Sequence, residues 1–280
     1  MRNLKRALSL ALAAIMLIGM MVVSASAASY NDLTDKDQIV NKDAVSMLVS
    51  LGIIEGKPDG SYGPTENVDR AQMAKMLSVI MNKGVDNSAL YQSVNSGLVD
   101  VNTNWAKGHI NYCYTTGIIA GRGNGKFDPS ATVTALEAAK MLLVAVGYDP
   151  AIEGFEGADW AINVSVRADE QGIFEGFTKD LSAPLNRDDA ALLIYNALDV
   201  EMIQSYTTNN YPIVYSDHRT ILSDKYGVIK VEGLSPPMSG PSWTTTPIPR
   251  CRRARPASTT PTASCPPPAT PPWPRIPAPT

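Results

Sequence analysis

Apolar residues recur every three or four positions along much of the chain, and this periodicity predicts amphipathic helices in three successive pairs. The first helix of each pair is expected at about 36–51, 104–116 and 158–171. The second helix begins near residues 69, 134 and 186. Its apolar positions in the three copies are Met73, Met76, Leu77 and Ile80; Ala138, Met141, Leu142 and Val146; and Ala190, Leu193, Ile194 and Leu198. Methionines at this spacing indicate a packed core and not a metal site.

A glycine-containing phrase separates the two helices of each pair. GIIEGKPDGSYGP begins at Gly52, GIIAGRGNGKFDP at Gly117, and the shorter GIFEGFTKDLSAP at Gly172. Each of these glycines follows the last periodic residue of a helix, where a left-handed helix cap favours glycine. The phrase therefore ends one helix and turns the chain into the next.

The Asp59-Gly60 and Asn124-Gly125 dipeptides within these phrases are typical of tight turns. A calcium loop at Asp59 is the alternative interpretation. The other oxygen ligands that such a loop places at fixed spacing are missing. We therefore expect turns here and no bound metal.

Each second helix opens with a capping sequence. The clearest are DRAQ from Asp69 and TALE from Thr134, and NRDD from Asn186 is a weaker version. One helix pair cannot bury its apolar face alone, whereas three stacked pairs can. The expectation is an all-α body of three tandem helix-loop-helix repeats (28–90, 91–150 and 151–203) forming a pseudo-threefold bundle.

The segment 204–235 has a different pattern. Its apolar and polar residues alternate as in a β-hairpin, with Tyr226-Gly227 near the expected turn. We expect a short β-hairpin-like segment that opens a second, truncated β-containing domain.

The N-terminal stretch 1–27 has the features of a secretory signal peptide. Arg2, Lys5 and Arg6 precede an uncharged apolar run, and Ala25-Ser26-Ala27 provides small residues for signal peptidase. An uncleaved membrane anchor is the alternative, and both interpretations export the body of the protein. No later run reaches the length of a membrane span, so no membrane contact is expected after signal cleavage.

The C-terminal stretch 236–280 holds 15 of the chain's 21 prolines and five arginines, but no Asp or Glu. This composition predicts a disordered Pro/Arg/Thr-rich tail. Two origins remain open: a natural wall linker, or a frameshift near Leu234. Moving the frame back by one base turns the Trp243-Thr244 junction into an Asp codon, and it gives the following residues an ordinary soluble composition.

Charge and cysteine content narrow the function classes. Without the two ends, 16 basic residues accompany 27 acidic ones, which gives a net charge of −11. Such an acidic body argues against a nucleic-acid partner. Cys113 is the single cysteine outside the tail, so neither a disulfide framework nor a cysteine-rich metal site is expected. We expect no cofactor.

Two arginines stand where a cation is unfavourable. Arg70 and Arg187 occupy the first turn of their helices, at the positive end of the helix dipole. One explanation is an ion pair with Asp32 or Asp188. The other is an anion site, because a helix N-terminus supplies free N–H groups and arginine adds a two-pronged donor for a carboxylate.

Trp105 and Trp160 occupy equivalent positions in the second and third repeats. Each lies at the start of the first helix of its repeat, where the first repeat has Val40. An exposed tryptophan beside an anion site would stack on a sugar ring. A buried one would be part of the core.

The order of these motifs resembles the S-layer homology family. The matching segments are YND and LVD, WAKGHI and WAINVS, the three glycine phrases, DGSYGP and NGKFDP, and VDRAQM, VTALEA and LNRDDA. The resemblance implies three tandem modules that attach the chain to the cell wall without a covalent bond. It further implies an anionic, often pyruvylated, secondary cell-wall polysaccharide as the partner.

The resemblance also implies site residues. The carboxylate would meet Arg70 and Arg187 in grooves between neighbouring modules; Asp32 and Asp100 match the family's opening aspartates, and Trp105 and Trp160 its tryptophans. Ala135 replaces the arginine in the second repeat, and the third repeat has a shorter loop and no aromatic-x-Asp opening. One or two competent sites are therefore expected instead of three.

The sequence offers no catalytic constellation. His109 and His218 are isolated, and no nucleophile-base-acid spacing is present. The leading interpretation is a secreted, non-enzymatic anchor at the cell wall or cell surface, with surface-layer neighbours as further partners. The alternatives are the N-terminal anchor of an exported enzyme, such as a glycan hydrolase whose catalytic half is missing, and a self-assembling lattice protein.

Overall fold

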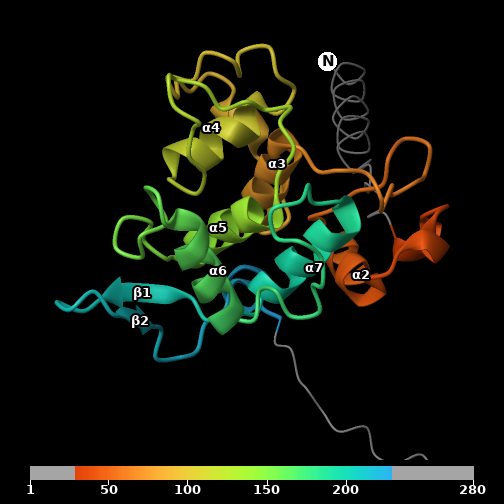
Figure 1. The fold of residues 1–280 in the computed structure, drawn as a ribbon. Helices are drawn as coiled ribbons and strands as arrows, with labels where there is room; N and C mark the ends of the chain where they lie inside the picture. The colour runs from red at the N-terminus through yellow and green to blue at the C-terminus, as the bar shows by residue number, and fades with distance from the viewer. Residues whose placement is uncertain (1–28, 229–280) are drawn as a thin grey trace, which may run out of the picture. The chain divides into compact units, whose positions relative to one another are not determined.

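The computed structural model of the protein describes residues 29–228, which are mostly helical (Figure 1). The expected signal peptide (1–27) and tail (236–280) lie outside the described residues. The α-helices are α2 (Lys42–Ser50), α3 (Arg70–Met81), α4 (Lys107–Thr115), α5 (Ala135–Val146), α6 (Trp160–Glu170), α7 (Arg187–Ala197) and α8 (Ile221–Tyr226). The 3-10 helices η1 (Tyr30–Asp32), η2 (Lys36–Gln38) and η3 (Ser88–Tyr91) and the strands β1 (Ile203–Tyr206) and β2 (Pro212–Val214) complete the elements. None of the described helices is long and apolar enough to span a membrane.

The second helices α3, α5 and α7 begin where their capping sequences predict. The Asp69 carboxylate accepts the N–H of Gln72 at 2.7 Å, and the Gln72 side chain accepts the N–H of Asp69 in return. Thr134 and Glu137 form the same reciprocal pair. Asn186 accepts the N–H of Asp189 without a return bond, which makes it the weaker cap.

The first helices are shorter than the periodicity predicts. The expected helix at 36–51 is broken into η2 and α2, because Ile39 takes an extended conformation and is buried. α4 begins at Lys107 instead of near residue 104, because the Asn104 side chain accepts the N–H of Ala106 and forms a turn there. Apolar periodicity continues through such turns and does not mark them.

Gly52, Gly117 and Gly172 end α2, α4 and α6 with φ angles of 71°, 78° and 70°. The isoleucine after each glycine donates its N–H to a carbonyl five residues earlier, at 2.8 to 2.9 Å. This is the Schellman arrangement, so the predicted left-handed caps are confirmed. The isoleucines themselves, Ile53, Ile118 and Ile173, are buried in the core.

The helices of different repeats interlock. The first helix of each repeat packs on the second helix of the repeat before it: α4 on α3, α6 on α5, and α2 on α7. Figure 1 shows these pairs side by side, with α5 also in contact with α3 and α7. Each repeat therefore completes its neighbour and is not a separate globule.

A ring of backbone hydrogen bonds joins the three repeats just before their second helices. The N–H of Val68 donates to Leu185, that of Leu185 to Val133, and that of Val133 to Val68, at 2.8, 2.8 and 3.0 Å. All three side chains are buried. The equivalent residues of the three repeats thus bind one another in a cycle, which gives the fold its pseudo-threefold symmetry.

The segment after the repeats differs from expectation in two ways. Its hairpin is formed by β1 and β2, so the turn lies between residues 206 and 212; Tyr226-Gly227 instead ends α8, where Gly227 has a φ of 66°. The described part of 204–235 is also not a separate domain. Ile203, Ile221 and Leu222 are buried in the helical core, and the N–H of Leu222 donates to the carbonyl of Leu198.

Candidate functional site

Arg70, the first residue of α3, binds the loop of the second repeat. Its Nε and Nη2 donate to the carbonyls of Phe127 and Ala120, both at 2.8 Å, and its guanidinium lies 4.3 Å from the centre of the Phe127 ring. The residue is 5% exposed. Its burial, with a smaller effect of Arg122, lowers the pKa of Arg70 to about 10, so the group stays charged at neutral pH.

Arg187, the first residue of α7, makes the same contacts with the first repeat. It donates to the carbonyls of Tyr62 at 2.8 Å and Glu55 at 3.4 Å, and it lies 4.8 Å from the centre of the Tyr62 ring. Each arginine therefore ties its own helix to the glycine phrase of the next repeat in the ring.

These contacts correct the ion-pair explanation of the misplaced arginines, and they change which donors an anion site would use. Among residues 29–228, neither arginine has an ion pair with Asp32 or Asp188. The first N–H groups of the helices are also occupied. Those of Arg70 and Ala71 donate to the carbonyls of Ala131 and Pro129, and α7 makes the equivalent bonds to the first repeat. An anion would meet the remaining guanidinium edge and not free helix N–H groups.

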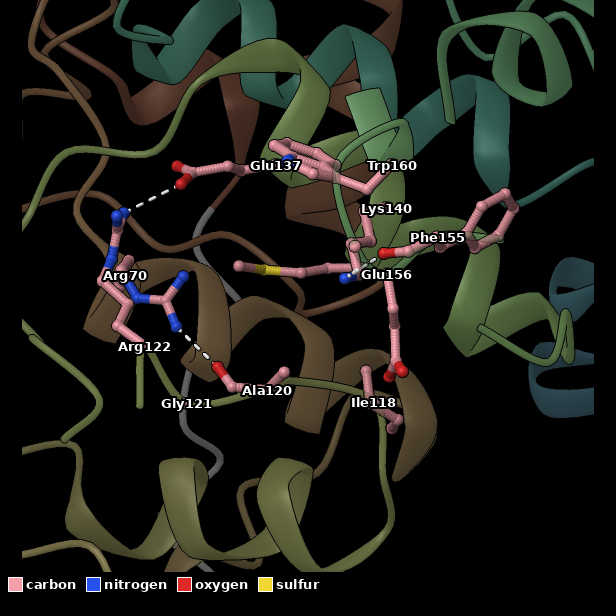
Figure 2. Close-up of a pocket in the computed structure, with 12 residues that line it drawn as sticks. Arg70, Ile118, Ala120, Gly121, Arg122, Glu137, Lys140, Phe155, Glu156 and Trp160 are labelled. Carbon is pink, nitrogen blue, oxygen red and sulfur yellow. Dashed lines mark hydrogen bonds and ion pairs between the residues drawn. The ribbon is translucent and has the colours of Figure 1, made fainter. Parts of the chain in front are cut away.

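A groove lies beside Arg70 at the junction of all three repeats (Figure 2). We call it the Trp160 groove; its charged and aromatic lining is Arg70, Arg122, Glu137, Lys140 and Trp160, with Phe155 and Glu156 at one side. Its volume is about 350 Å³. Arg122 and Glu137 form an ion pair of 2.8 Å, and the Lys140 ammonium donates to the Phe155 carbonyl and lies 5.7 Å from the centre of the Trp160 ring.

A second groove of about 180 Å³ lies beside Arg187. This Trp105 groove is lined by the repeat equivalents of the first: Arg187, Lys57, Gln72, Lys75 and Trp105. Lys75 pairs with Glu55 at 2.9 Å, and Lys57 pairs with Glu66. The two predicted arginines and two predicted tryptophans are therefore brought together as two pairs, Arg70 with Trp160 and Arg187 with Trp105.

The two tryptophans differ in exposure. Trp105 is 59% exposed, whereas Trp160 is partly buried and packs against the core. Trp160 thus lies between the two expected situations, because it packs against the core and also lines a groove. Trp105 presents more of its ring to solvent.

The predicted aspartates serve the loops and line neither groove. The Asp100 carboxylate accepts the N–H groups of Phe127 and Asp128 at 2.8 to 3.1 Å. Burial acts to raise the pKa of Asp100, but these donors outweigh it and hold the pKa below its ordinary value. Asp100 therefore braces the turn that carries Phe127.

Asp32 is not the equivalent of Asp100, which corrects the alignment made from the sequence. Asp32 lies in η1, where it accepts the N–H of Ser29. The equivalent residue is Asp35, whose carboxylate accepts the N–H groups of Tyr62 and Gly63, both at 2.7 Å. The matching segments are LTD and LVD, because their leucines are both buried.

The third junction lacks the groups of the other two. Ala135 stands in place of the arginine, Val40 in place of the tryptophan, and Leu192 in place of the lysine. The shorter third loop also has no aromatic residue at the position of Phe127, so an arginine at 135 would have no ring to lie on. The hollow near this junction is lined instead by Asp188, Asp189 and Lys179, and the last two form an ion pair.

Metal binding has no support within residues 29–228, where no three His, Cys, Asp or Glu side chains gather. The Asp59 carboxylate accepts the N–H and the hydroxyl of Ser61 at 2.9 and 2.7 Å. It therefore forms a tight turn, as its sequence predicts.

Sequence reasoning missed the other cations of the grooves. Lys75 and Lys140 lie at the same position of α3 and α5, five residues after the helix starts, and Lys57 and Arg122 match within the glycine phrases. A position-by-position comparison of the first two repeats would have found both pairs, because they are 65 residues apart like the glycines.

Comparison with known proteins places two segments in a family. Residues 29–74 and 99–139 match the S-layer homology domain. The chain is 30% identical over 206 residues to a cell surface protein of Thermoanaerobacter kivui, which covers 73% of this chain and 26% of that protein. It is 33% identical over 113 residues to an S-layer protein of Bacillus licheniformis, covering 40% of this chain and 12% of that protein.

An enzyme is also among the relatives. An amylopullulanase of Thermoanaerobacterium thermosulfurigenes is 30% identical over 185 residues, which covers 61% of this chain and 10% of the enzyme. The chain thus spans 26% or less of the length of these surface proteins and of this enzyme. The domain match and the surface-protein relatives together support secretion to the cell wall or surface.

Proposed function

We propose that the chain is a non-covalent cell-wall anchor that binds an anionic, pyruvylated secondary cell-wall polysaccharide. The S-layer homology match supports the anchoring role. The composition of the two grooves is the observation that supports an anionic polysaccharide as the ligand. Each places an arginine, a lysine and a tryptophan around one hollow, although the body of the chain is strongly acidic.

The groove chemistry suits a sugar that carries a carboxylate. Arginine has five N–H donors. The Nε and Nη2 atoms of Arg70 each donate to a backbone carbonyl, so further N–H donors remain for a ligand. Lys140 adds a second cation, and the Trp160 ring offers an apolar face on which a sugar ring can stack. Under this proposal Arg70 with Trp160, and Arg187 with Trp105, contact the glycan, whereas Asp100 and Asp32 do not.

We further propose that residues 28–90, 91–150 and 151–203 are three modules of one family, although the family match covers only parts of the first two. The hydrogen-bond ring and the cyclic helix packing support this assignment, because the third repeat takes part in both on equal terms.

The test is sedimentation of the secreted chain, from residue 28 onward, with Gram-positive wall sacculi. The sacculi are used before and after removal of the secondary polysaccharide. The combined Lys75→Gln and Lys140→Gln variant is expected to bind at least about tenfold more weakly, since each groove loses a cation that lines it. Lys83→Gln, which removes an exposed lysine outside both grooves, serves as the matched control.

Binding that disappears with the polysaccharide and weakens in the double variant supports the proposal. Binding that survives both changes contradicts it and indicates another wall component as the partner. The lysines are preferred to Arg70 for this test, because Arg70 is also part of the joint between two repeats.

A second candidate is that the chain anchors a larger exported enzyme. The amylopullulanase relative supports this, since its similarity to this chain covers only a tenth of its length. Resequencing the gene around Leu234 tests it. A restored frame that continues into a catalytic domain would support the enzyme, and an intact frame would contradict it.

A further inference from the structure

A buried histidine lies directly behind the Trp105 groove. His109 is in α4, is 4% exposed, and its ring meets that of Trp105 edge-on with 6.4 Å between centres. Its Nδ1 lies 2.6 Å from the Ser78 hydroxyl of α3, and that hydroxyl contacts the Lys75 carbonyl at 3.0 Å. His109 thus connects, through one hydroxyl, to the backbone of the lysine that lines the groove.

A carboxylate faces the other ring nitrogen. The Nε2 of His109 lies 3.6 Å from the Asp86 carboxylate, in the segment that follows α3. The further charges that act on His109 are the Lys75 ammonium, which opposes protonation, and the Glu55 carboxylate, which favours it. Ser78 and Trp105 are its uncharged polar and aromatic neighbours.

A proton on His109 would complete this chain of contacts. The neutral ring carries one N–H and can donate on one side only. The protonated ring donates on both sides, to the Ser78 oxygen and to Asp86, while the Ser78 hydroxyl donates to the Lys75 carbonyl. Both N–H groups of the protonated ring therefore have an acceptor. The proton also adds a positive charge behind Trp105 and Lys75, which line the groove.

We propose that His109 makes ligand binding in the Trp105 groove stronger at mildly acidic pH. The inference rests on the proposed function, because it concerns the anionic ligand of the same groove. A positive charge beneath Trp105 and Lys75 favours an anion there, and a bound anion in turn favours the proton on His109.

The Trp160 groove provides an internal control. At the positions equivalent to His109 and Ser78 it has Val164 and Leu143, and both are fully buried. No titratable side chain stands behind Trp160 at that place. Ligand binding in the Trp160 groove should therefore lack the pH dependence that His109 gives to binding in the Trp105 groove.

The experiment measures binding of the secreted chain to polysaccharide-bearing sacculi at about pH 7.5 and about pH 5.5, on either side of the ordinary histidine pKa. It compares Lys140→Gln, in which the Trp105 groove remains intact, with Lys140→Gln combined with His109→Val. The valine copies the residue of the third repeat. The first protein is expected to bind at least about threefold more tightly at the lower pH, and the second to lose that gain.

A second measurement does not depend on the valine variant folding. The sequence contains two histidines, His109 and His218, so the ring signals of the wild-type protein can be followed by NMR. Soluble polysaccharide released from the sacculi is expected to raise the pKa of His109, and the His218 signal serves as the internal reference.

The outcomes separate the two proposals. No binding of the wild type at either pH overturns the polysaccharide function and, with it, this inference. Binding with the same pH dependence in both proteins, or a His109 pKa that ignores the polysaccharide, overturns the inference alone. Weaker binding at the lower pH would also overturn it, since protonation would then be loosening α4 from α3.

Discussion

At the residue scale, Arg70 and Arg187 each hold two neighbouring repeats together. Each donates to two carbonyls of the next repeat and lies on an aromatic ring. Where the arginine is missing, at Ala135, the facing loop also has no aromatic residue at the position of Phe127. The arginine and the longer loop therefore form one structural unit, present at two junctions and absent from the third.

Replacing Arg70 is expected to destabilise the protein. Arg70→Gln leaves the buried carbonyl of Phe127 and the part-buried carbonyl of Ala120 without their charged donor, so the free energy of unfolding should fall by about 2–4 kcal/mol. Arg187→Gln is the comparison; it should cost less, because Arg187 is more exposed and one of its bonds is 3.4 Å long. Urea unfolding measures both, and equal losses would contradict this account.

His109 is expected to make the stability of the unliganded protein pH-dependent. Burial lowers the pKa of His109 below its ordinary value of 6.5, and Asp86 only partly opposes this. The unfolded chain then binds the proton more readily, so stability is complete above about pH 6.5 and decreases as the pH falls through that range. In thermal unfolding, His109→Val should remove this slope between about pH 7 and about pH 5.

Three carboxylates act outside that pH range. The pKa values of Asp35, Asp86 and Asp100 are lowered from an ordinary value of 3.8, so their stabilising effect is lost only in more acidic solution. A slope that persists unchanged in the valine variant would assign the effect to another group.

Residue roles could be predicted from the sequence only in part. The cap residues Asp69 and Thr134 were identified, because a capping box is a local pattern. Asp35 was missed in favour of Asp32, because both fit an aspartate near the repeat start and only the distant N–H groups of Tyr62 and Gly63 distinguish them. Lys75 and Lys140 give no such signal, because a lysine within a helix violates no local rule.

At the scale of elements, α4 contains a glycine where helix propensity alone would favour another residue. A Cβ at Gly108 would lie 2.1 Å from the Ser88 carbonyl oxygen of η3. The close approach of η3 to α4 thus requires the absence of a side chain. Helix and 3-10 helix are in direct backbone contact at this point.

Gly108→Ala should therefore destabilise the protein, although alanine is the better helix former by about 1 kcal/mol. The Cβ would have to push η3 away from α4, and the Tyr91 ring packed on Tyr112 would move with it. The melting temperature is the measurement, with Lys107→Ala, one residue earlier, as the control. An alanine variant as stable as the wild type would show that the contact can relax freely.

Element boundaries were predictable where a side chain marks them. The left-handed glycines and the caps of α3, α5 and α7 confirmed their predictions. The starts of α2 and α4 did not follow the periodicity, because Ile39 is extended and Asn104 forms a turn, while the apolar residues around them stay on the correct face. The apolar periodicity indicates which residues are buried, and it does not distinguish a helix from a buried turn.

At the scale of the whole described body, the segment after the repeats belongs to the core. β1 begins at a buried Ile203, α8 contributes Ile221 and Leu222, and the Tyr226 hydroxyl donates to the Ile80 carbonyl at 3.3 Å. The hairpin could be predicted from the sequence, but its packing on the helical core could not. Alternating apolar and polar residues predict a strand without indicating which part of the protein its apolar face contacts.

Leu222→Ala should lower the free energy of unfolding by about 2–5 kcal/mol, the usual cost of a large cavity in a core. Tyr211→Ala, at a site 71% exposed in the hairpin, should cost little and is the control. Denaturant unfolding measures both. A loss for Leu222→Ala no larger than that of the control would mean that α8 is only loosely attached.

The ring of Val68, Val133 and Leu185 limits how such a protein can evolve. Each repeat donates one backbone hydrogen bond and accepts one, and each first helix covers the helix of the repeat before it, so three copies close the circle. A fourth copy would find no unpaired edge, and removing one copy would leave two edges open. The number of junctions between repeats is therefore constant. Mutation can change the chemistry of a surface junction only by adding or removing side chains at the three that exist. The junction at Ala135, with its shortened loop, is the one that lacks the arginine, the tryptophan and the lysine.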